Sequence, residues 1–481
     1  MRHTILILFT GLLLTLTVSC DNWLDVRPQT EVKVDDNFKT AQGFKDALTG
    51  IYLLMSDQAI YGQELSFGMG DVLGKQYTTP FSASGQYYDL SQYNYTTDQA
   101  KGVIDPVWSK MYNVIANVNS LIEHINKADQ TMFSGVEYNV IRGEAYALRA
   151  FLHFDLVRLF GPSYKTGAST KAIPYEETFD NQVTELSTVA EVITKALGDL
   201  TIAEQELVND PVIENGGYTT ETVDYADYLR MRHHKFNYYA VKLLQARIHL
   251  YKADYGEAFK AADAIIKQDV FSWVPGGTVT TPSPAGRNLV FVQELIFSLD
   301  IANLQTVMEA WDDGGYTKVK EQFTTVYETD QASYSYDYRY QYLTLDGGST
   351  RYHIKLYQDN TADYYGYTGE VPIMRMSEAY YIAAECRLNQ NDPEGAVGYL
   401  NTVRNARNLG EDLNLNPNLT KDQIQEEIFK EYAKEFVMEG QLFYYYKRIN
   451  SPTIRFYTEG VSADTYVLPL PDDEVEGRLG E

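Results

Sequence analysis

The chain has 481 residues, and its 66 aspartates and glutamates outnumber 40 lysines and arginines to give a formal net charge of −26. That length is ample for a large core in one or two domains. Nucleic acids and anionic lipid surfaces bind positive potential, so the charge argues against both and favours neutral or cationic ligands.

The first twenty residues predict export. Arg2 precedes an apolar run over residues 5–18, which is shorter than the ~20 apolar residues of a membrane-spanning helix and is typical of a signal peptide. Residues 16–20, of sequence LTVSC, resemble a bacterial lipobox in which Cys20 becomes the acylated first residue. Several acyl chains would hold the mature protein on a membrane without spanning it. We therefore expect residues 1–19 to be a signal peptide and Cys20 to carry lipid.

Cysteine usage agrees with this interpretation. Cys20 and Cys386 are the two cysteines of the chain, and an exported protein with two cysteines has no disulfide framework. If Cys20 is lipidated, Cys386 has no disulfide partner. We expect Cys386 to be a small buried residue within a helix.

Helical periodicity dominates the rest of the chain. Residues 42–55 and 107–126 predict one helix pair, and residues 142–160 and 188–207 predict a second. The third of these segments has the clearest pattern, since a Gly-Pro pair ends it and its apolar residues form one stripe. The stripe consists of Ala145, Leu148, Leu152, Leu156 and Leu159.

Two later segments share the pattern Ala-x3-Leu-x3-Asp-x3-Ala. They cover residues 246–258 and 384–396, with Asp254 and Asp392 near the expected turns. Small alanines let two helices cross closely, and this spacing is typical of tetratricopeptide-like hairpins that stack on a shared core. Together with the two pairs above, the sequence predicts a mainly α fold with about four such pairs.

Two stretches, residues 56–105 and 271–371, interrupt the helical pattern. Both are rich in glycine, threonine, tyrosine and proline, and long irregular loops in a compact protein are usually functional. The chain holds 40 tyrosines, whose flat apolar face and hydroxyl match the C–H faces and hydroxyl edges of sugars. The candidate ligand-binding residues in the two insertions are Tyr77, Phe81, Tyr87, Tyr88, Trp311, Asp312, Asp313, Tyr316 and Tyr336.

Trp311 is the first choice among these residues. Residues 311–316, of sequence WDDGGY, place two aromatic rings around a flexible turn, with carboxylates that accept hydrogen bonds from sugar hydroxyls. The alternative is that Trp311 packs the loop onto the helices. Tyr87 and Tyr88 are neighbours that face opposite ways in an extended segment, so at most one is expected to meet ligand.

Other motifs indicate no catalytic or cofactor site. Residues 68–75 contain glycines and a lysine, but their spacing does not match a phosphate-binding loop. His233 and His234 would point about 100 degrees apart on a helix, so we expect them not to share a metal ion. The chain has no Gly-x-Ser-x-Gly elbow. We expect no catalytic residue, cofactor or metal, although paired acids for glycoside cleavage have a spatial separation that a sequence does not reveal.

Several motifs follow one another in a fixed order. They are DNWLD at residues 21–25, a helix over residues 41–52, VWSKMYNVIANVN at residues 107–119, GEAYALRAF at residues 143–151, RLFG at residues 158–161, the two repeats, and the segments 401–407 and 431–440. Together they resemble the RagB/SusD family, the outer-membrane lipoproteins of nutrient-uptake systems in Bacteroidetes.

The resemblance implies a single domain over residues 20–481, in which four tetratricopeptide-like pairs carry an irregular ligand-binding face. It also implies non-catalytic binding and docking as a lid on a TonB-dependent transporter of the SusC type. We therefore expect a surface lipoprotein of the outer membrane that binds oligosaccharide and delivers it to this transporter. The alternatives are a peptide-binding member of the family and a purely structural protein-interaction scaffold.

One acidic row remains to be placed. Glu427, Glu431, Glu435 and Glu439 recur every four residues and share one helix face, with two lysines beside them. Such a row could bind calcium, but the lysines favour a solvated or transporter-facing surface with local ion pairs.

Overall fold

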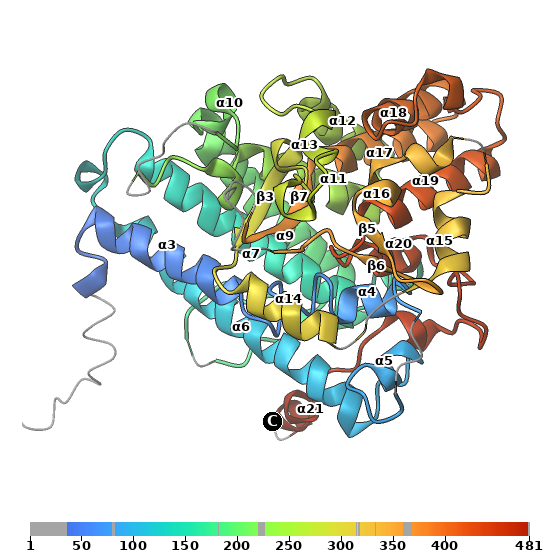
Figure 1. Ribbon diagram of the computed structural model, residues 1–481. Helices are drawn as coiled ribbons and strands as arrows, with labels where there is room; N and C mark the ends of the chain where they lie inside the picture. The colour runs from blue at the N-terminus through green and yellow to red at the C-terminus, as the bar shows by residue number, and fades with distance from the viewer. Residues whose placement is uncertain are drawn as a thin grey trace, which may run out of the picture.

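The computed structural model describes residues 36–78, 82–180, 182–219, 227–313, 315, 318–331, 333–358 and 368–479. The predicted signal peptide and the predicted lipid attachment at Cys20 lie outside the described residues. In the part that is described, helices dominate and the strands form three small antiparallel sheets (Figure 1). The prediction of a mainly α fold is confirmed.

The scaffold consists of four helix pairs that also pack on one another in chain order. The pairs are α3 (Ala41–Met55) with α6 (Asp98–Lys127), α7 (Glu137–Phe160) with α9 (Val189–Glu206), α11 (Tyr238–Tyr251) with α12 (Tyr255–Ile266), and α17 (Met376–Asn389) with α18 (Pro393–Ala406). These are the pairs that the sequence predicts. Between pairs, α6 packs on α7, α9 on α11, and α12 on α17, so the four pairs share one continuous core.

The two sequence repeats form equivalent hairpins. Asp254 and Asp392 are the N-caps of α12 and α18, and each side chain accepts a hydrogen bond from a backbone N–H of the first turn. The residue before each cap, Ala253 or Asn391, has a left-handed φ of 60° or 61°, which reverses the chain between the two helices. The small residues of the pattern are fully buried where the helices cross: Ala246, Ala258, Ala384 and Ala396. Cys386 is also buried on α17, as expected.

Helix α7 is the central element of the scaffold. The predicted stripe faces the core, but the opposite side of α7 is buried as well, because α6, α9 and α11 surround it. The charged side chains on that side are therefore paired. Arg149 makes two 2.7 Å hydrogen bonds to Asp199 on α9, and Arg232 donates to Glu144 at 2.6 Å.

The second insertion contains more regular structure than its composition predicts. The expectation that residues 271–371 are irregular is wrong, because short helices and strands form there against the core. They are α13 (Gly276–Val279), β3 (Leu295–Asp300), α14 (Leu304–Asp313), β4 (Lys318–Val319), α15 (Lys320–Tyr327), α16 (Tyr338–Gln341), β5 (Thr344–Asp346), β6 (Thr350–His353) and β7 (Glu370–Arg375). Strand β3 pairs with β7, and β4, β6 and β5 form a separate antiparallel sheet.

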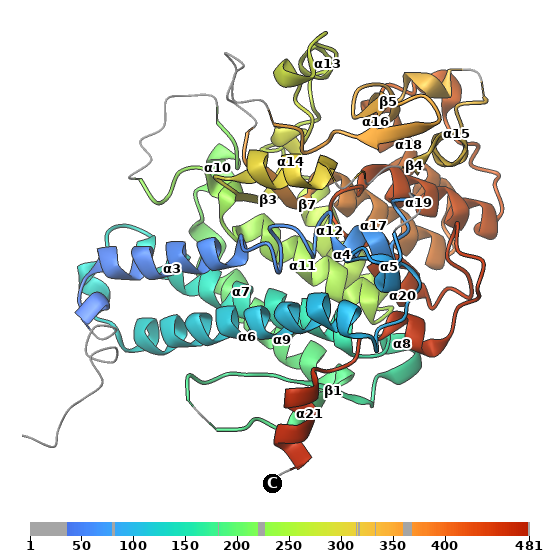
Figure 2. The same cartoon turned by 60° about the horizontal axis from the view of Figure 1, so that its bottom comes forward.

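The first insertion is shorter and lies beside the second (Figure 2). It contains α4 (Met69–Leu73) and α5 (Tyr88–Ser91), and its last residues form the start of α6. The remaining named elements are α8 (Tyr164–Gly167), β1 (Lys171–Pro174), β2 (Leu186–Thr188), α10 (Val212–Asn215), α19 (Lys421–Glu435), α20 (Gln441–Ile449) and α21 (Asp472–Leu479). No helix in the described ranges is both long enough and apolar enough to cross a bilayer.

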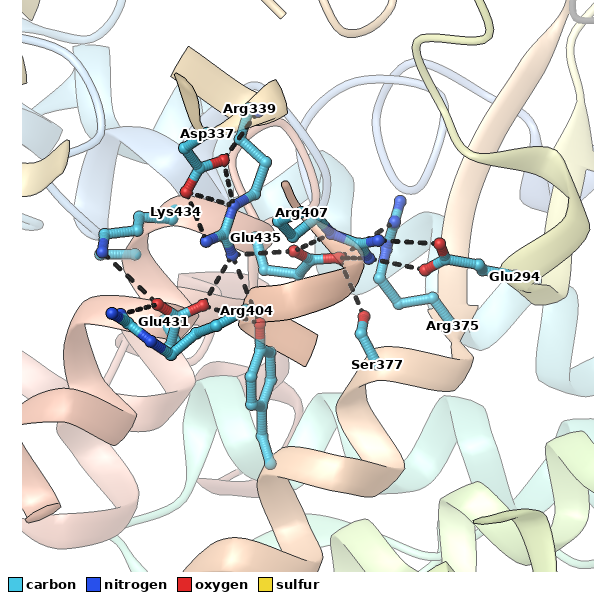
Figure 3. A network of polar contacts seen from close by, with 12 residues as sticks. Glu294, Asp337, Arg339, Arg375, Ser377, Arg404, Arg407, Glu431, Lys434 and Glu435 are labelled. Atoms are coloured by element: carbon cyan, nitrogen blue, oxygen red, sulfur yellow. Dashed lines mark hydrogen bonds and ion pairs between the residues drawn. The ribbon is translucent and has the colours of Figure 1, made fainter. Parts of the chain in front are cut away.

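The glutamate row of α19 lies in the core. Glu431, Glu435 and Glu439 are each at most 3% exposed, so the expectation of a solvated or transporter-facing row is wrong. Glu431 and Glu435 share one face of α19, as predicted, whereas Glu439 lies in the turn after the helix. That face meets arginines from other elements (Figure 3). The arginines come from segments far away in sequence, and for this reason the sequence pattern does not reveal them.

Glu435 and Glu431 are the acceptors at the centre of this network. Glu435 accepts hydrogen bonds from Arg407 at 2.6 Å, Arg339 at 3.0 Å and Ser377 at 2.9 Å. Glu431 accepts from Arg339 at 2.8 Å. Burial alone would raise the pKa of Glu435, but Arg407, Arg339 and Arg375 hold that pKa well below its ordinary value.

The network joins elements that the chain separates. Arg339 comes from α16, Arg375 ends β7, and Arg407 directly follows α18. Arg407 also donates to Glu294 at 2.6 and 2.8 Å, just before β3 begins. The second insertion is therefore fastened to the fourth helix pair and to α19 through buried charges.

Replacing one central carboxylate should destabilise the protein strongly. Glu435→Gln keeps the shape of the side chain but leaves buried arginines without their counter-charge, so we expect a loss of about 3–5 kcal/mol in unfolding free energy. Urea denaturation followed by circular dichroism measures it. The matched control is Glu426→Gln on the same helix, whose side chain is 47% exposed and pairs with Arg455. It should cost about 0–1 kcal/mol. Equal losses in the two variants would contradict the account.

Candidate functional site

The two insertions meet at a buried group of aromatic rings. Trp311 on α14 packs against Phe67, Tyr77 and Tyr87 of the first insertion, with ring centroids 5.3, 5.5 and 5.7 Å away. The interplanar angles of 59–81° are those of tilted and edge-to-face pairs, which aromatic rings prefer over a face-to-face sandwich. We call these four residues the aromatic cluster. Its rings hold the two insertions together.

The hydroxyl groups of the cluster bind buried carboxyl groups. Tyr87 Oη donates to Glu64 Oε1 at 2.8 Å, and Tyr77 Oη donates to the Phe67 carbonyl at 3.0 Å and, more weakly, to Asp71 at 3.4 Å. Burial raises the pKa of Glu64 and of Asp71 to about 7, although hydrogen bonds to both groups oppose the shift.

Asp71 links the cluster to the C-terminal part of the chain. Its carboxylate accepts the backbone N–H groups of Met438 at 2.6 Å and Gly440 at 3.0 Å, directly before α20. Gly70 lies so close that a Cβ there would come 2.9 Å from the Cα of Gly440, and Gly440 itself has a φ of +67°. The glycines of residues 68–75 therefore serve the close approach of α4 to α20, in keeping with the expectation that this segment is no phosphate loop.

Buried lysines border the same region. Lys318 of β4 donates to the carbonyl of Lys75 at 2.9 Å, and Val319 N donates to Thr78 Oγ1 at 2.8 Å. Burial lowers the pKa of Lys318 to about 7 and that of Lys75 to about 8. The β4–β6–β5 sheet is thus attached to Lys75 and Thr78 of the first insertion, on either side of Tyr77 in the aromatic cluster.

The predicted site residues divide into three groups. Trp311, Tyr77 and Tyr87 are brought together, but they are only 2–4% exposed, so their rings face one another. Tyr88 on α5 is half-buried, and Asp312 at the end of α14 is exposed, as is Tyr336. Tyr336 lies beside Asn408, whose side chain donates to its carbonyl. Phe81, Tyr316 and the side chain of Asp313 lie outside the described residues.

Sequence reasoning missed an exposed apolar pair on the small sheet. Leu345 of β5 and Tyr352 of β6 are register partners, and their side chains are 43% and 40% exposed. The side chain of Tyr357, five residues after Tyr352 in the chain, is 39% exposed. The sequence of β6 carries no signal for Tyr352, because the strand buries Arg351 and His353 and exposes the aromatic residue between them, the reverse of the usual alternation. We use the name insertion face for five side chains of the two insertions: the half-buried Tyr88 and the exposed Asp312, Leu345, Tyr352 and Tyr357.

A hollow lies on another part of the molecule. It has a volume of about 800 Å³ and is formed by α6, the segment between β1 and β2, and α21. Its lining includes the exposed Phe179 together with the carboxylates of Asp180, Asp472 and Glu474. In Figure 2 two elements beside this acidic hollow, β1 and α21, lie below α6, whereas α14 lies above α6. The motif at residues 107–119 contributes to its lining, but no predicted ligand-binding residue does.

The imidazoles of His233 and His234 lie closer together than expected. The two residues belong to a 3-10 helix, η5 (Arg232–His234), and their ring centroids are 4.0 Å apart. The expectation that they point apart as on an α-helix is wrong, because both rings turn toward Glu370 of β7.

Family comparisons agree with the fold. The profile described as starch-binding and associating with the outer membrane matches residues 22–220, and the profile of the SusD family matches residues 286–476. The chain belongs to the SusD/RagB family. Among its relatives is SusD-like protein P2 of Formosa agariphila, which is 25% identical over 98% of this chain and 96% of its own length.

Solved structures share the architecture. A SusD superfamily protein from Bacteroides thetaiotaomicron superposes with a TM-score of 0.69 at 24% identity, covering 91% of this chain and 98% of its own. A protein from Bacteroides vulgatus described as sugar binding superposes with a TM-score of 0.66 at 22% identity, covering 90% of this chain and 91% of its own. These similarities show that the SusD/RagB fold extends over almost the whole chain.

Because Trp311 is buried, we expect its replacement to lower the stability of the protein. Trp311→Ala should lower the unfolding free energy by about 3–5 kcal/mol, because the ring leaves a cavity between the two insertions. Asp312→Ala, one residue further and exposed, should change it by less than about 0.5 kcal/mol. Urea denaturation of both variants is the measurement. A stable Trp311→Ala protein would show that the cluster does not hold the insertions together.

Proposed function

We propose that this protein captures oligosaccharide at the cell surface and delivers it, without cleaving it, to a TonB-dependent outer-membrane transporter of the SusC type. Membership of the SusD/RagB family supports a binding protein rather than an enzyme. The starch-binding description of the profile over residues 22–220 and the sugar-binding description of the Bacteroides vulgatus relative support a carbohydrate ligand.

The observation that carries this proposal is that both insertions expose sugar-compatible side chains. Tyr352 and Tyr88 offer partly exposed rings, and Asp312 offers an exposed carboxylate at the end of α14. Sugars bind such surfaces by stacking C–H faces on rings and donating hydroxyl hydrogen bonds to carboxylates. Tyr87 and Trp311, the chain neighbours of Tyr88 and Asp312, are held in the buried aromatic cluster, so the backbone at these two positions is fixed before a ligand binds.

The candidate residues take different roles in this proposal. Trp311, Tyr77 and Tyr87 support the ligand-binding face from below, while Asp312 and Tyr88 contact the sugar directly. Phe81, Asp313 and Tyr316 are proposed as further contacts because they flank these residues in sequence. Tyr336 is proposed as a contact for a longer ligand.

Lipid anchoring completes the proposal. Acylation of Cys20 would confine the binding domain to the membrane that holds its transporter and so raise their effective concentration. The rigid scaffold of four helix pairs suits a lid that docks as one body.

The acidic hollow favours one alternative, the capture of basic peptides. Its carboxylates, together with a formal net charge of −26, would attract cationic chains more strongly than neutral sugars. A purely structural scaffold is the remaining alternative, and it requires no small ligand.

Glycan binding should be measurable without turnover. The chain from residue 21 onward should bind members of a glycan array and return the bound oligosaccharide intact. In calorimetry, Tyr352→Ala should weaken binding about tenfold, which corresponds to ~1.4 kcal/mol for one lost stacking contact. Phe179→Ala removes an exposed ring, 53% against 40% for Tyr352, from the acidic hollow and serves as the control.

Each alternative gives a distinct result. Binding to a peptide array alone, weakened by Phe179→Ala, would favour peptide capture. Cleaved glycan that disappears in a carboxylate variant would contradict the non-catalytic role. Binding of neither class, with a stable transporter complex, would leave the scaffold function.

A further inference from the structure

Three side chains with metal-ligating atoms converge where η5 meets β7. His233 Nε2 lies 3.2 Å and His234 Nε2 lies 2.7 Å from the same carboxylate oxygen, Oε1 of Glu370. All three candidate ligand atoms lie within 4.8 Å of one another. His233 and Glu370 are buried, whereas the side chain of His234 is 19% exposed.

Neighbouring groups orient these ligand atoms. His233 Nδ1 lies 2.8 Å from the carbonyl oxygen of Gly217, and because a carbonyl only accepts, Nδ1 carries the proton. Nε2 faces the Glu370 carboxylate, which also only accepts, so Nε2 donates to it in the metal-free protein, and a bound ion would displace that proton and take the Nε2 lone pair. The other oxygen of Glu370 accepts a 2.5 Å hydrogen bond from Ser298 Oγ. Metal-binding histidines and carboxylates are usually held by such outer hydrogen bonds.

The spacing suits a small divalent ion. Zinc binds histidine nitrogen and carboxylate oxygen at about 2.0–2.2 Å in tetrahedral geometry, which places ligand atoms roughly 3.3–3.5 Å apart. The observed separations of 3.2 and 2.7 Å from Glu370 Oε1 need only a small adjustment to reach that range. Two imidazoles and one carboxylate are the donor set of many three-ligand zinc sites.

The site has an entry path on one side. A cavity of about 360 Å³ is lined by His234, Lys235, Tyr228 and Asp300. Asp300 is exposed and is the register partner of Glu370 across the β3–β7 ladder. The fourth coordination position would face this cavity and be filled by water or by Asp300.

We propose that His233, His234 and Glu370 bind a divalent transition-metal ion, with Zn²⁺ as the fitting example. The ion acts as a structural clip. Strand β7 runs directly into α17, and η5 lies a few residues before α11. The clip therefore ties together the entrances of the two repeat hairpins across 137 residues of chain.

The test is metal binding by protein purified without a histidine tag and dialysed against chelator. Zn²⁺ titrated by calorimetry should bind with one-to-one stoichiometry and raise the thermal midpoint, and Co²⁺ should give the visible absorption of a tetrahedral site. His234→Gln and Glu370→Gln should each weaken binding at least ~10-fold, the minimum cost reported for disturbing even the outer hydrogen bonds of such sites.

His249→Gln is the matched control. His249 also lies beside a carboxylate, Asp254 at 3.4 Å, and its side chain is 17% exposed, but among the described residues it belongs to no three-ligand cluster. It should leave Zn²⁺ affinity unchanged. Absence of saturable Zn²⁺ and Co²⁺ binding by the unmodified protein, or equal affinity in His234→Gln, Glu370→Gln and His249→Gln, would overturn the proposal and leave a histidine–glutamate ion pair only.

Discussion

Glu431 and Glu435 impose the constraint on which the second insertion depends. A buried carboxylate is tolerated only where cations surround it, since its desolvation otherwise costs several kcal/mol. Here the cations are Arg339, Arg375 and Arg407, supplied by α16, by the end of β7 and by the residue after α18. None of these elements can shift without exposing an unpaired charge to the core. The glutamates of α19 thus determine where the second insertion lies on the helical scaffold.

The first insertion is fixed by aromatic packing and backbone hydrogen bonds rather than by buried ion pairs. Its rings surround Trp311, and Asp71 binds the backbone just before α20, so both insertions are held to the C-terminal helices. A face attached in two independent ways can present side chains in a fixed geometry. That property suits a protein that binds a ligand by many weak contacts, because order already present is not lost on binding. The helical pairs supply the rigid body, and the insertions supply recognition.

The sequence predicts much of the scaffold because helical spacing and capping are local. The four pairs and the caps at Asp254 and Asp392 follow from patterns within about twelve residues. The site is harder to predict because its contacts are long-range. The four-residue spacing of the glutamates reveals a shared face but not that Arg339 and Arg407 meet it. The sequence of residues 311–316 identifies Trp311 but not that Tyr77 and Tyr87 cover its ring. Likewise, the adjacency of His233 and His234 predicts rings that point apart. A 3-10 helix and strand β7, 137 residues further along the chain, instead bring both rings to Glu370.

A crystal structure of the chain from residue 21 onward with a bound oligosaccharide tests the central claim most directly. The account predicts an intact sugar over the insertion face, with a ring stacked on Tyr352 or Tyr88 and a hydroxyl bonded to Asp312. The scaffold and the buried network of α19 should be unchanged by the ligand. A sugar seated in the acidic hollow between α6 and α21, or a cleaved product at either place, would contradict it.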